Sequence, residues 1–442
     1  MFKKILIANR GEIAIRIIRA CREMGIETVA IYSTIDKEAL HVQMADEAVC
    51  VGPPTDSYTN IGRILSATVL TGAEAIHPGF GFLSENSRFA QMCQECNITF
   101  IGPDAEIIEK MGNKSNARKL MMEANVPVIP GSKEPIADDE KALKTAEEIG
   151  YPVMIKASAG GGGRGIRVVK EEGELLDALN MAKKEAKAAF GDDTMYMEKF
   201  LEKPRHVEIQ ILADHYGNTI HLGERDCSIQ RRNQKVLEEG PCPVMTKELR
   251  DKMGQAAVNA AQYVGYKNAG TIEFLLDNHN NFYFMEMNTR IQVEHPVTEF
   301  ITGVDLIKEQ VKIAAGQQLK LLQEDIKISG HAIECRINAE DPKRNFMPSP
   351  GKVEVLFMPG GLGVRVDTLL FDGYVIPPSY DSMVAKLIVH GKDREEAINK
   401  MRRALGEFLL DGISTNIDFQ FSIINNPKFL AGEYDTGFVS NL

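Results

Sequence analysis

The sequence predicts a mixed α/β protein of about three domains: an open-sheet domain, a middle domain with a mobile glycine-rich lid, and a C-terminal α+β domain. The chain has 442 residues, and a domain typically holds about 150 residues. Short apolar runs alternate with segments whose apolar residues recur at helical spacing. Hydrophobic residues make up 44% and charged residues 26% of the chain, which is typical of a globular protein.

The first hundred residues repeat a strand–helix–strand pattern. The predicted strands are residues 5–8, 28–32, 74–77 and 98–101. A first helix lies between the first two strands, where four apolar residues recur at helical spacing: Ile13, Ile17, Cys21 and Met24. Gly25 ends this helix, and another begins at about Ser84. This pattern predicts an open, mostly parallel sheet flanked by helices, and the absence of G-x-G-x-x-G after the first strand disfavours dinucleotide binding.

The middle region opens near Lys110 and contains the predicted lid. Helices are expected over residues 115–124 and from about 174 to 190, and the predicted strands are 152–156, 166–169, 207–212, 271–275 and 282–287. Pro130-Gly131 and Pro204 bound the lid and are suited to act as hinges.

The last third starts near Ser329. Strands are expected over 331–337 and 385–389, separated by the turn-rich segment 359–363. Asp393 is a plausible N-cap for a helix from about Arg394, with Glu396 three residues after the cap. One face of that helix is apolar and comprises Ala397, Met401, Ala404, Leu405 and Phe408.

Charge and cysteine content exclude several functional classes. The net charge of −11 argues against non-specific binding to nucleic acid or an anionic membrane, although a local basic patch can still bind a small anion. Seven cysteines, with Cys93 and Cys96 forming a single C-x-x-C, do not suggest a disulfide framework or a zinc site. The start of the chain does not resemble a signal peptide, and no apolar run is long enough to span a membrane. We therefore expect a cytoplasmic protein.

The glycine cluster at 159–165 predicts a phosphate-binding flap. It follows a strand, but the next residues, 166–170, are rich in β-branched side chains and predict a second strand, not the helix of a Walker loop. Unobstructed backbone N–H groups can fold over phosphate oxygens, and Lys156 would add a cation beside them. The alternative is a merely flexible hairpin, which is disfavoured because ordering four consecutive glycines costs much entropy.

A second hairpin predicts a metal site. The turn signal at 277–281 places Glu273 across from Glu286, and the two-residue strand period puts Asn288 on the Glu286 side. Two facing carboxylates repel unless a cation lies between them, and an all-oxygen set suits Mg²⁺ or Mn²⁺ better than zinc. A solvated hairpin face with a shifted register is the alternative.

Three polar residues follow the carboxylates directly. Arg290, Gln292 and Glu294 share one face if the segment is extended, where Arg could hold an anionic substrate and Glu could act as a general base. The segment 224–235 carries four cations, and charge alone does not distinguish a solvated loop from an anion-binding one. Arg336 is similarly ambiguous.

Taken together, these motifs resemble the biotin carboxylases, the ATP-grasp subunits of bacterial acetyl-CoA carboxylase. The resemblance covers essentially the whole chain. It begins at residues 7–14 and is most specific in residues 77–86, 156–165, 286–296 and 334–341. It implies a pre-ATP-grasp domain over 1–112, an ATP-grasp domain over 113–328 with its lid at about 131–203, and a C-terminal domain over 329–442.

The resemblance also implies roles for individual residues. The residues implied to hold ATP are Lys114, Lys156, Gly162, Gly163, Glu198, Lys199, Leu201, His206, Asn233, Glu273 and Glu286. Those implied to hold one or two Mg²⁺ or Mn²⁺ ions are Glu273, Glu286 and Asn288. Bicarbonate would be held by Lys235, Arg290, Gln292, Val293 and Glu294, and Arg336 would contact biotin. Glu294 would deprotonate bicarbonate, which would attack ATP to give carboxyphosphate, and CO₂ released from it would carboxylate biotin.

Two positions depart from the pattern. Phe80 stands where many members have Tyr near biotin, and Asn233 stands where some have His near the nucleotide ribose. Because no Ala-Met-Lys-Met biotinylation motif occurs, we expect a separate biotin carboxyl carrier protein, a separate carboxyltransferase and, from the family, a homodimer. The alternatives are the same subunit in a pyruvate or propionyl-CoA carboxylase, another ATP-grasp carboxylate–amine ligase, and a nucleotide-binding regulator without catalysis.

Overall fold

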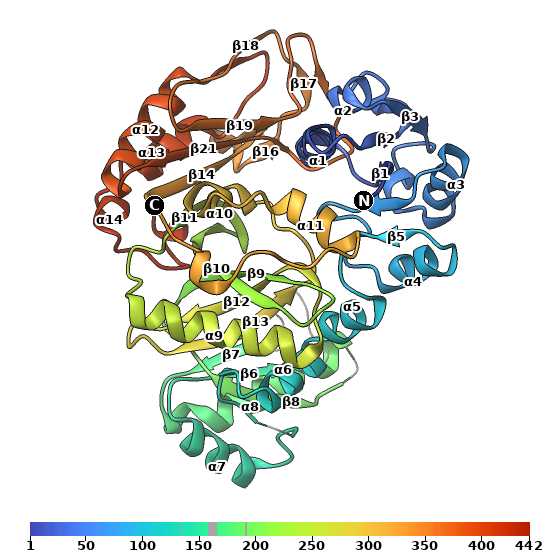
Figure 1. Ribbon diagram of the computed structural model, residues 1–442. Helices are drawn as coiled ribbons and strands as arrows, with labels where there is room; N and C mark the ends of the chain where they lie inside the picture. The colour runs from blue at the N-terminus through green and yellow to red at the C-terminus, as the bar shows by residue number, and fades with distance from the viewer. Residues whose placement is uncertain (133, 158–165, 191) are drawn as a thin grey trace. The chain divides into compact units, whose positions relative to one another are not determined.

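The computed structural model describes residues 1–132, 134–157, 166–190 and 192–442. The chain forms two compact units. One contains residues 1–126, 205–274 and 286–442, and the other contains residues 127–204 and 275–285. The mixed α/β architecture predicted from the sequence is confirmed (Figure 1).

The N-terminal part of the larger unit is built on a five-stranded parallel sheet of order β3-β2-β1-β4-β5. Its strands are β1 (Lys4–Ile7), β2 (Glu27–Tyr32), β3 (Glu47–Cys50), β4 (Ala75–His77) and β5 (Thr99–Phe100). The accompanying helices are α1 (Gly11–Glu23), α2 (Leu40–Met44), α3 (Ile61–Thr71), α4 (Ser87–Glu95), α5 (Ala105–Gly112) and α6 (Lys114–Glu123). Apolar side chains of β1 and α1 are fully buried, as expected for a sheet covered by helices.

The helix expected from about Ser84 begins three residues later. The Asn86 side chain accepts a hydrogen bond from the Phe89 amide at 2.9 Å and caps α4. Ser84 lies in the preceding turn, where its amide donates to the Gly81 carbonyl at 3.0 Å. A cap residue closer to the apolar run therefore determines where the helix starts.

The larger unit also contains most of an eight-stranded sheet of order β13-β12-β9-β10-β11-β14-β21-β19. The strands are β9 (Arg205–Ala213), β10 (Thr219–Arg231), β11 (Gln234–Gly240), β12 (Asn268–Leu276), β13 (Phe282–Asn288), β14 (His331–Asn338), β19 (Val364–Thr368) and β21 (Met383–Gly391). β11 pairs antiparallel with β14, so strands from both sides of Ser329 share one sheet. Helix α9 (Lys247–Val264) packs on β9 and β10, and α10 (His295–Thr302) packs on β10, β11 and β14. Helix α11 (Leu306–Ala314) packs against α1.

The C-terminal segment adds a second layer to this sheet. Helix α12 (Arg394–Glu407) packs on β21 and β14, and α13 (Ile417–Ile424) and α14 (Pro427–Ala431) follow it. The predicted N-cap is confirmed, because Asp393 Oδ1 accepts from the Glu396 amide at 2.9 Å. Three two-stranded sheets complete the segment: β15 (Glu340–Asp341) with β16 (Met347–Pro348), β17 (Gly351–Lys352) with β20 (Val375–Ile376), and β18 (Val355–Phe357) with β22 (Leu409–Asp411).

The smaller unit contains a three-stranded antiparallel sheet of order β7-β6-β8, formed by β6 (Val153–Ala157), β7 (Ile166–Val169) and β8 (Met195–Lys199). Helices α7 (Asp139–Ile149) and α8 (Leu175–Phe190) pack with these strands around a core of Val153, Ile155, Leu179 and Met197. The predicted glycine loop, including Gly162 and Gly163, lies outside the described residues. The two strands that flank it pair directly, as predicted.

Candidate active site

Lys235 lies at the centre of a buried cluster of charges. It stands at the start of β11, and its Nζ lies 2.6 Å from Glu208 Oε2, 2.6 Å from Glu294 Oε1 and 2.8 Å from Glu273 Oε1. Burial opposes the ammonium charge, but the surrounding carboxylates outweigh it and hold the pKa of Lys235 well above its ordinary value. The site therefore contains a fixed cation held by three carboxylates.

Glu294 is fully buried and accepts hydrogen bonds from two cations. It is the residue before α10, so the start of that helix fixes its backbone. Its Oε1 binds Lys235, and its Oε2 accepts from Arg336 Nη2 at 2.9 Å. Burial alone would raise the pKa of Glu294, yet the two cations hold it well below its ordinary value. Glu294 is therefore an ionised carboxylate with both oxygens directed at cations.

Arg336 links Glu294 to a second layer of carboxyl groups. It projects from β14, and its Nε donates to Glu238 Oε1 at 2.6 Å. Burial raises the pKa of Glu238 to about 7, against the opposing effect of Arg336. Glu334 lies opposite Glu238 across β11 and β14, and burial raises the pKa of Glu334 as well. Charge pattern alone left the role of Arg336 open, and the structure places it in the same cluster as Lys235.

Arg290 donates hydrogen bonds to Glu85 and to residues near it in the sequence. Its Nε donates to Glu85 Oε2 at 2.8 Å, its Nη1 to Gln292 Oε1 at 2.9 Å and its Nη2 to Asn288 Oδ1 at 2.9 Å. Glu85 also accepts from the Thr289 amide at 3.0 Å. The guanidinium direction is therefore fixed while its side chain remains 18% exposed.

The three predicted metal ligands come from the neighbouring strands β12 and β13. Asn288 Nδ2 donates to Glu273 Oε1 at 2.9 Å, so these two side chains are in contact. Glu286, two residues before Asn288, is partly exposed, and its Oε2 lies 3.7 Å from Lys114 Nζ. Two carboxylates and an amide oxygen form the hard-oxygen donor set that Mg²⁺ and Mn²⁺ prefer.

The environment of Glu273 fits a divalent cation. Burial opposes ionisation, but Lys235 and His206 hold the pKa of Glu273 well below its ordinary value. Its Oε1 also accepts from Gln292 Nε2 at 2.9 Å, and its Oε2 lies 2.9 Å from His206 Nε2. His206, Glu208 and Glu273 each place one ligand atom within 4.8 Å of the others. Glu273 is thus an ionised carboxylate, the form in which it can bind a metal, and its present partners are Lys235, His206 and two side-chain amides.

Predicted ATP ligands occur in both compact units. In the larger unit, His206 Nδ1 contacts Gln230 Nε2 at 2.6 Å, and the exposed Asn233 occupies the turn between β10 and β11. In the smaller unit, Lys156 forms an ion pair with Glu198. Lys199 Nζ donates to the carbonyls of Gly150 at 2.9 Å and Tyr151 at 2.8 Å. Leu201 lies two residues after the end of β8 and is partly buried.

The basic segment 224–235 does not form a solvated loop. Arg225 is fully buried, and its Nε donates to Glu208 Oε1 at 2.6 Å. Arg231 pairs with Glu340 at 3.3 Å, and Arg232 donates to Asn345 at 3.1 Å. Of these four cations, Arg225 and Lys235 contact the carboxylates of the cluster, whereas Arg231 and Arg232 contact residues of the segment 340–345.

Sequence reasoning missed Glu208, Glu238 and Glu85, although each has a sequence signal. Glu208 alternates with Gln210 in the apolar strand 205–213, and polar residues inside such a strand require buried partners. Glu238 occupies an equivalent position in β11. Glu85 lies within the specific motif 77–86, so its position in that motif was the signal that could have found it.

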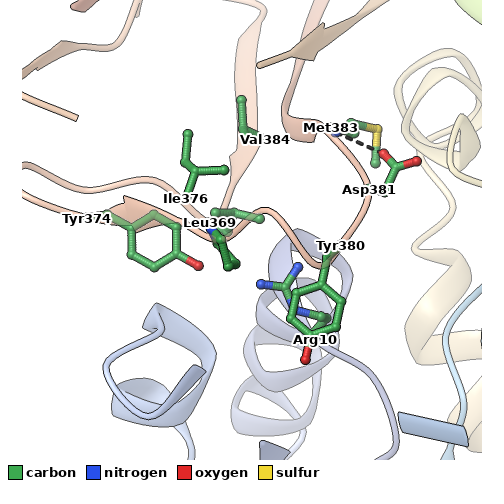
Figure 2. Close-up of a pocket in the computed structure, with 9 residues that line it drawn as sticks. Arg10, Leu369, Tyr374, Ile376, Tyr380, Asp381, Met383 and Val384 are labelled. Atoms are coloured by element: carbon green, nitrogen blue, oxygen red, sulfur yellow. Dashed lines mark hydrogen bonds between the residues drawn. The ribbon is translucent and has the colours of Figure 1, made fainter. Parts of the chain in front are cut away.

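A small pocket is lined by Arg10 and by residues between 369 and 384, none of which belongs to the charge cluster (Figure 2). Arg10 forms two hydrogen bonds of 2.8 Å with Asp36, and its guanidinium stacks 4.0 Å from the centre of the Tyr380 ring. Because these contacts already satisfy the charge of Arg10, the pocket is a packing feature, not an anion site.

Comparison with known proteins identifies the family. Residues 1–108 match the model of the biotin carboxylase N-terminal domain, residues 113–322 that of the carbamoyl-phosphate synthase L chain ATP-binding domain, and residues 334–441 that of the biotin carboxylase C-terminal domain. Biotin carboxylase 1 of Bacillus subtilis is 60% identical over 99% of this chain and 98% of its own length. A pyruvate carboxylase subunit of Methanothermobacter thermautotrophicus is 57% identical over 99% of this chain and 90% of its own length.

Solved structures give the same result. The biotin carboxylase domain of a thermophilic 2-oxoglutarate carboxylase bound to bicarbonate has a TM-score of 0.96 and 51% identity, covering 100% of this chain and 98% of that one. A complex of biotin carboxylase from Campylobacter jejuni with β,γ-ATP has a TM-score of 0.90 and 49% identity, covering 100% and 99%.

The fold, the charge cluster and these matches define an ATP-grasp ligase that forms a C–N bond. The chain belongs to the biotin carboxylase family. Its reaction is the carboxylation of biotin, with ATP and a divalent metal as cofactors. No helix in the described part of the chain is both long and apolar enough to cross a membrane.

Proposed function

We propose that bicarbonate binds between Arg290 and Lys235, with Gln292, Val293 and Glu294 completing its site. The two cations are held 2.6 to 2.9 Å from carboxylate or amide oxygens, so their positions are set before a substrate arrives. When bicarbonate binds, its oxygens would replace some of the protein oxygens that contact Arg290 and Lys235. The related domain solved with bicarbonate supports this assignment.

In this proposal, Glu294 is the general base. It takes the proton of bicarbonate, and a bicarbonate oxygen attacks the γ-phosphorus of ATP while the bond to the ADP oxygen breaks. The low pKa of Glu294 belongs to the carboxylate paired with Lys235 and Arg336. When bicarbonate binds, Lys235 would turn from Glu294 to the anion, and the loss of this contact would make Glu294 a stronger base.

A set of eleven residues is assigned to ATP. The proposed ligands are Lys114, Lys156, Gly162, Gly163, Glu198, Lys199, Leu201, His206, Asn233, Glu273 and Glu286. Glu273, Glu286 and Asn288 would hold the divalent metal, which neutralises charge gathering on the phosphates. Lys156 would add a cation at the end of β6, next to the glycine loop.

Arg336 and Arg290 are assigned to biotin carboxylation. Carboxyphosphate decomposes to CO₂ and phosphate, and phosphate accepts the ureido N1′ proton of biotin. The two guanidinium groups stabilise the enolate oxygen that develops while a bond forms between N1′ and the carbon of CO₂. Arg336 is supported in this role because Glu238 and Glu294 fix its direction from two sides.

We assign the protein to an acetyl-CoA carboxylase that supplies malonyl-CoA for fatty acid synthesis in the cytoplasm. A separate biotin carboxyl carrier protein would bring biotin, a carboxyltransferase would use carboxybiotin, and the protein would act as a homodimer. A related domain is described as a dimer, which supports the last assignment. The domain limits proposed are 1–112, 113–328 with the lid at about 131–203, and 329–442.

The test is an assay of ATP cleavage with Mg²⁺, with and without bicarbonate and free biotin. We expect cleavage that requires bicarbonate and is stimulated by biotin. Turnover on a carboxylate and an amine, with no effect of bicarbonate, would instead establish a carboxylate–amine ligase.

A second candidate is the same catalytic role in a pyruvate carboxylase, which the 57% identity to a pyruvate carboxylase subunit favours. Purified native partners distinguish the two. Carboxylation of acetyl-CoA but not of pyruvate is expected, and the reverse result would reassign the complex while leaving the biotin carboxylase reaction intact.

A further inference from the structure

A buried lysine that is not among the assigned site residues contacts the backbone of the proposed bicarbonate site. Lys386 lies on β21, its side chain is fully buried, and its Nζ donates to the Val293 carbonyl at 2.7 Å. Its nearest carboxylate is Glu12 of α1, with Oε1 at 3.3 Å. A fully buried ammonium is costly unless it is compensated, so the carbonyl is one of the few groups that stabilise it.

The carbonyl of Gln292, one residue before Val293, is also held by a buried side chain. His295 is fully buried, and its Nδ1 lies 2.8 Å from the Gln292 carbonyl oxygen. Burial and the nearby Lys386 keep the pKa of His295 well below its ordinary value, so the ring is neutral and Nδ1–H donates to this carbonyl. Two consecutive carbonyls are therefore held by Nδ1 of His295 and Nζ of Lys386.

Holding a carbonyl also fixes the next amide. A trans peptide unit is planar, so its C=O and the following N–H point in opposite directions. The bond from His295 thus sets the direction of the Val293 N–H, and the bond from Lys386 sets that of the Glu294 N–H. Within the described residues, neither amide donates to a protein acceptor. Two oriented N–H groups lie in the chain segment whose side chains contact Lys235 (through Glu294) and Arg290 (through Gln292), and such a pair is suited to an anion.

We propose that Lys386, together with His295, is a positioning residue for bicarbonate: it holds the peptide unit between Val293 and Glu294 in the direction that presents backbone N–H groups and the Glu294 side chain to the anion. This inference rests on the assignment of residues 290–294 to bicarbonate. It adds to the proposed bicarbonate site a positioning residue from β21, about 90 residues away in sequence.

The rest of the Lys386 environment is also charged. Glu334 of β14 and Asp367 of β19 act on it electrostatically, with Arg365 opposing them. If Lys386 served only to balance these carboxylates, its loss would affect stability and not the affinity for one substrate. The two roles therefore predict different kinetics.

The experiment compares Lys386→Met with Lys400→Met in the full chain. Lys400 is a matched control, because its Nζ also donates to a backbone carbonyl, that of His390 at 2.8 Å, and also pairs with a glutamate, Glu396 at 2.9 Å. Bicarbonate, ATP and biotin are varied separately in the ATP cleavage assay, and thermal melting reports folding.

We expect Lys386→Met to raise the KM for bicarbonate about ten- to a hundredfold, the range that a misplaced binding group can cost, while the KM for ATP stays within about twofold. Lys400→Met should change neither. An unchanged KM for bicarbonate in folded Lys386→Met, or an equal rise of all three KM values, would overturn the inference. If the unsubstituted protein shows no bicarbonate-dependent cleavage, the proposed function fails instead.

His295 supplies the test if Lys386→Met does not fold. His295→Leu removes the hydrogen bond to Gln292, whereas His295→Asn can place an amide nitrogen near the Nδ1 position. We expect the KM for bicarbonate to rise in the leucine variant and to return toward the original value in the asparagine variant. Equal values in the two variants, or loss of folding in both, would contradict a positioning role and indicate a structural one.

Discussion

At the scale of single residues, the site consists of charges that hold one another in place. Lys235 contacts three carboxylates, and Glu294 contacts two cations. In such a buried network, removing one member leaves its partners uncompensated, which costs more than the net gain from forming the pair. Each substitution is therefore informative only when it preserves shape and a matched measurement reports folding.

Glu294→Gln tests the general base. The amide keeps the shape of the side chain but cannot accept the bicarbonate proton, so we expect kcat to fall by about 10²-fold or more, with melting largely retained. Steady-state ATP cleavage with saturating bicarbonate provides the measurement. Activity close to that of the unsubstituted protein would exclude Glu294 as the base and favour a binding regulator without catalysis.

Arg336→Met tests the assignment of Arg336 to biotin. Loss of the guanidinium removes the charge that stabilises the enolate, so kcat/KM for free biotin should fall about tenfold or more. Bicarbonate-dependent ATP cleavage without biotin should be less affected. Arg336→Lys restores a charge without the forked geometry and should recover only part of the loss. A uniform loss of both activities would contradict a role specific to biotin.

The sequence suggested which residues form the proposed site, but it did not suggest which residues they contact. Glu273 and Asn288 belong to the two strands of the predicted hairpin and are in contact, and the two-residue repeat that suggested a shared face is a local property. The partners of Lys235 and Arg290 could not be predicted locally, since Glu85 lies 205 residues from Arg290 and Glu208 lies 27 residues from Lys235. Such contacts depend on tertiary packing.

At the scale of elements, the neighbouring strands β12 and β13 carry the proposed metal ligands. Glu286→Gln removes one of the two carboxylates, and we expect the Mg²⁺ concentration needed for half-maximal ATP cleavage to rise about tenfold or more. Because Glu286 is partly exposed, the substitution should not disturb folding. An unchanged Mg²⁺ requirement would remove Glu286 from the metal site.

The end of β4 carries a histidine that makes stability pH-dependent. His77 Nδ1 accepts from the Gly79 amide at 3.1 Å, and burial lowers the pKa of His77 from 6.5 to about 3. Between these values the unfolded chain binds a proton that the folded protein does not, so the stabilisation present above pH 6.5 decreases as the pH falls toward 3.

Thermal melting from about pH 7 to about pH 5 measures this effect. His77→Asn can keep the acceptor without the titrating ring, so its melting midpoint should fall less on acidification than that of the unsubstituted protein. His215→Asn is the control, because His215 is exposed. Parallel midpoint curves for the unsubstituted protein and His77→Asn would show that His77 does not contribute.

Element prediction succeeded where a local signal exists and failed where it does not. The Asp393 cap fixes the start of α12, and paired strands flank the glycine loop as expected. The strands β10 and β11 were not predicted, because their charged residues resemble a solvated loop. Arg225 and Glu208 neutralise each other inside the sheet, a compensation that hydrophobic periodicity cannot reveal.

At the scale of the whole molecule, sequence order and spatial order differ. Glu238 and Glu334 lie opposite each other although they are far apart in the chain, and Lys386 reaches Val293 from a strand 93 residues further along the chain. The mixed α/β class could be predicted from alternating patterns, whereas the pairing of β11 with β14 could not, because non-local strand pairing leaves little trace in either strand. The proposed site depends on that pairing, since it brings Arg336 to Glu294.

The origin of the oxygens in the released phosphate tests directly whether bicarbonate attacks ATP. If a bicarbonate oxygen attacks the γ-phosphorus, carboxyphosphate breakdown leaves that oxygen on phosphate. Turnover of ¹⁸O-labelled bicarbonate with unlabelled ATP and biotin should therefore place one labelled oxygen in each inorganic phosphate, as read by mass spectrometry. Phosphate without bicarbonate-derived label would mean that water cleaves ATP, and would contradict the account.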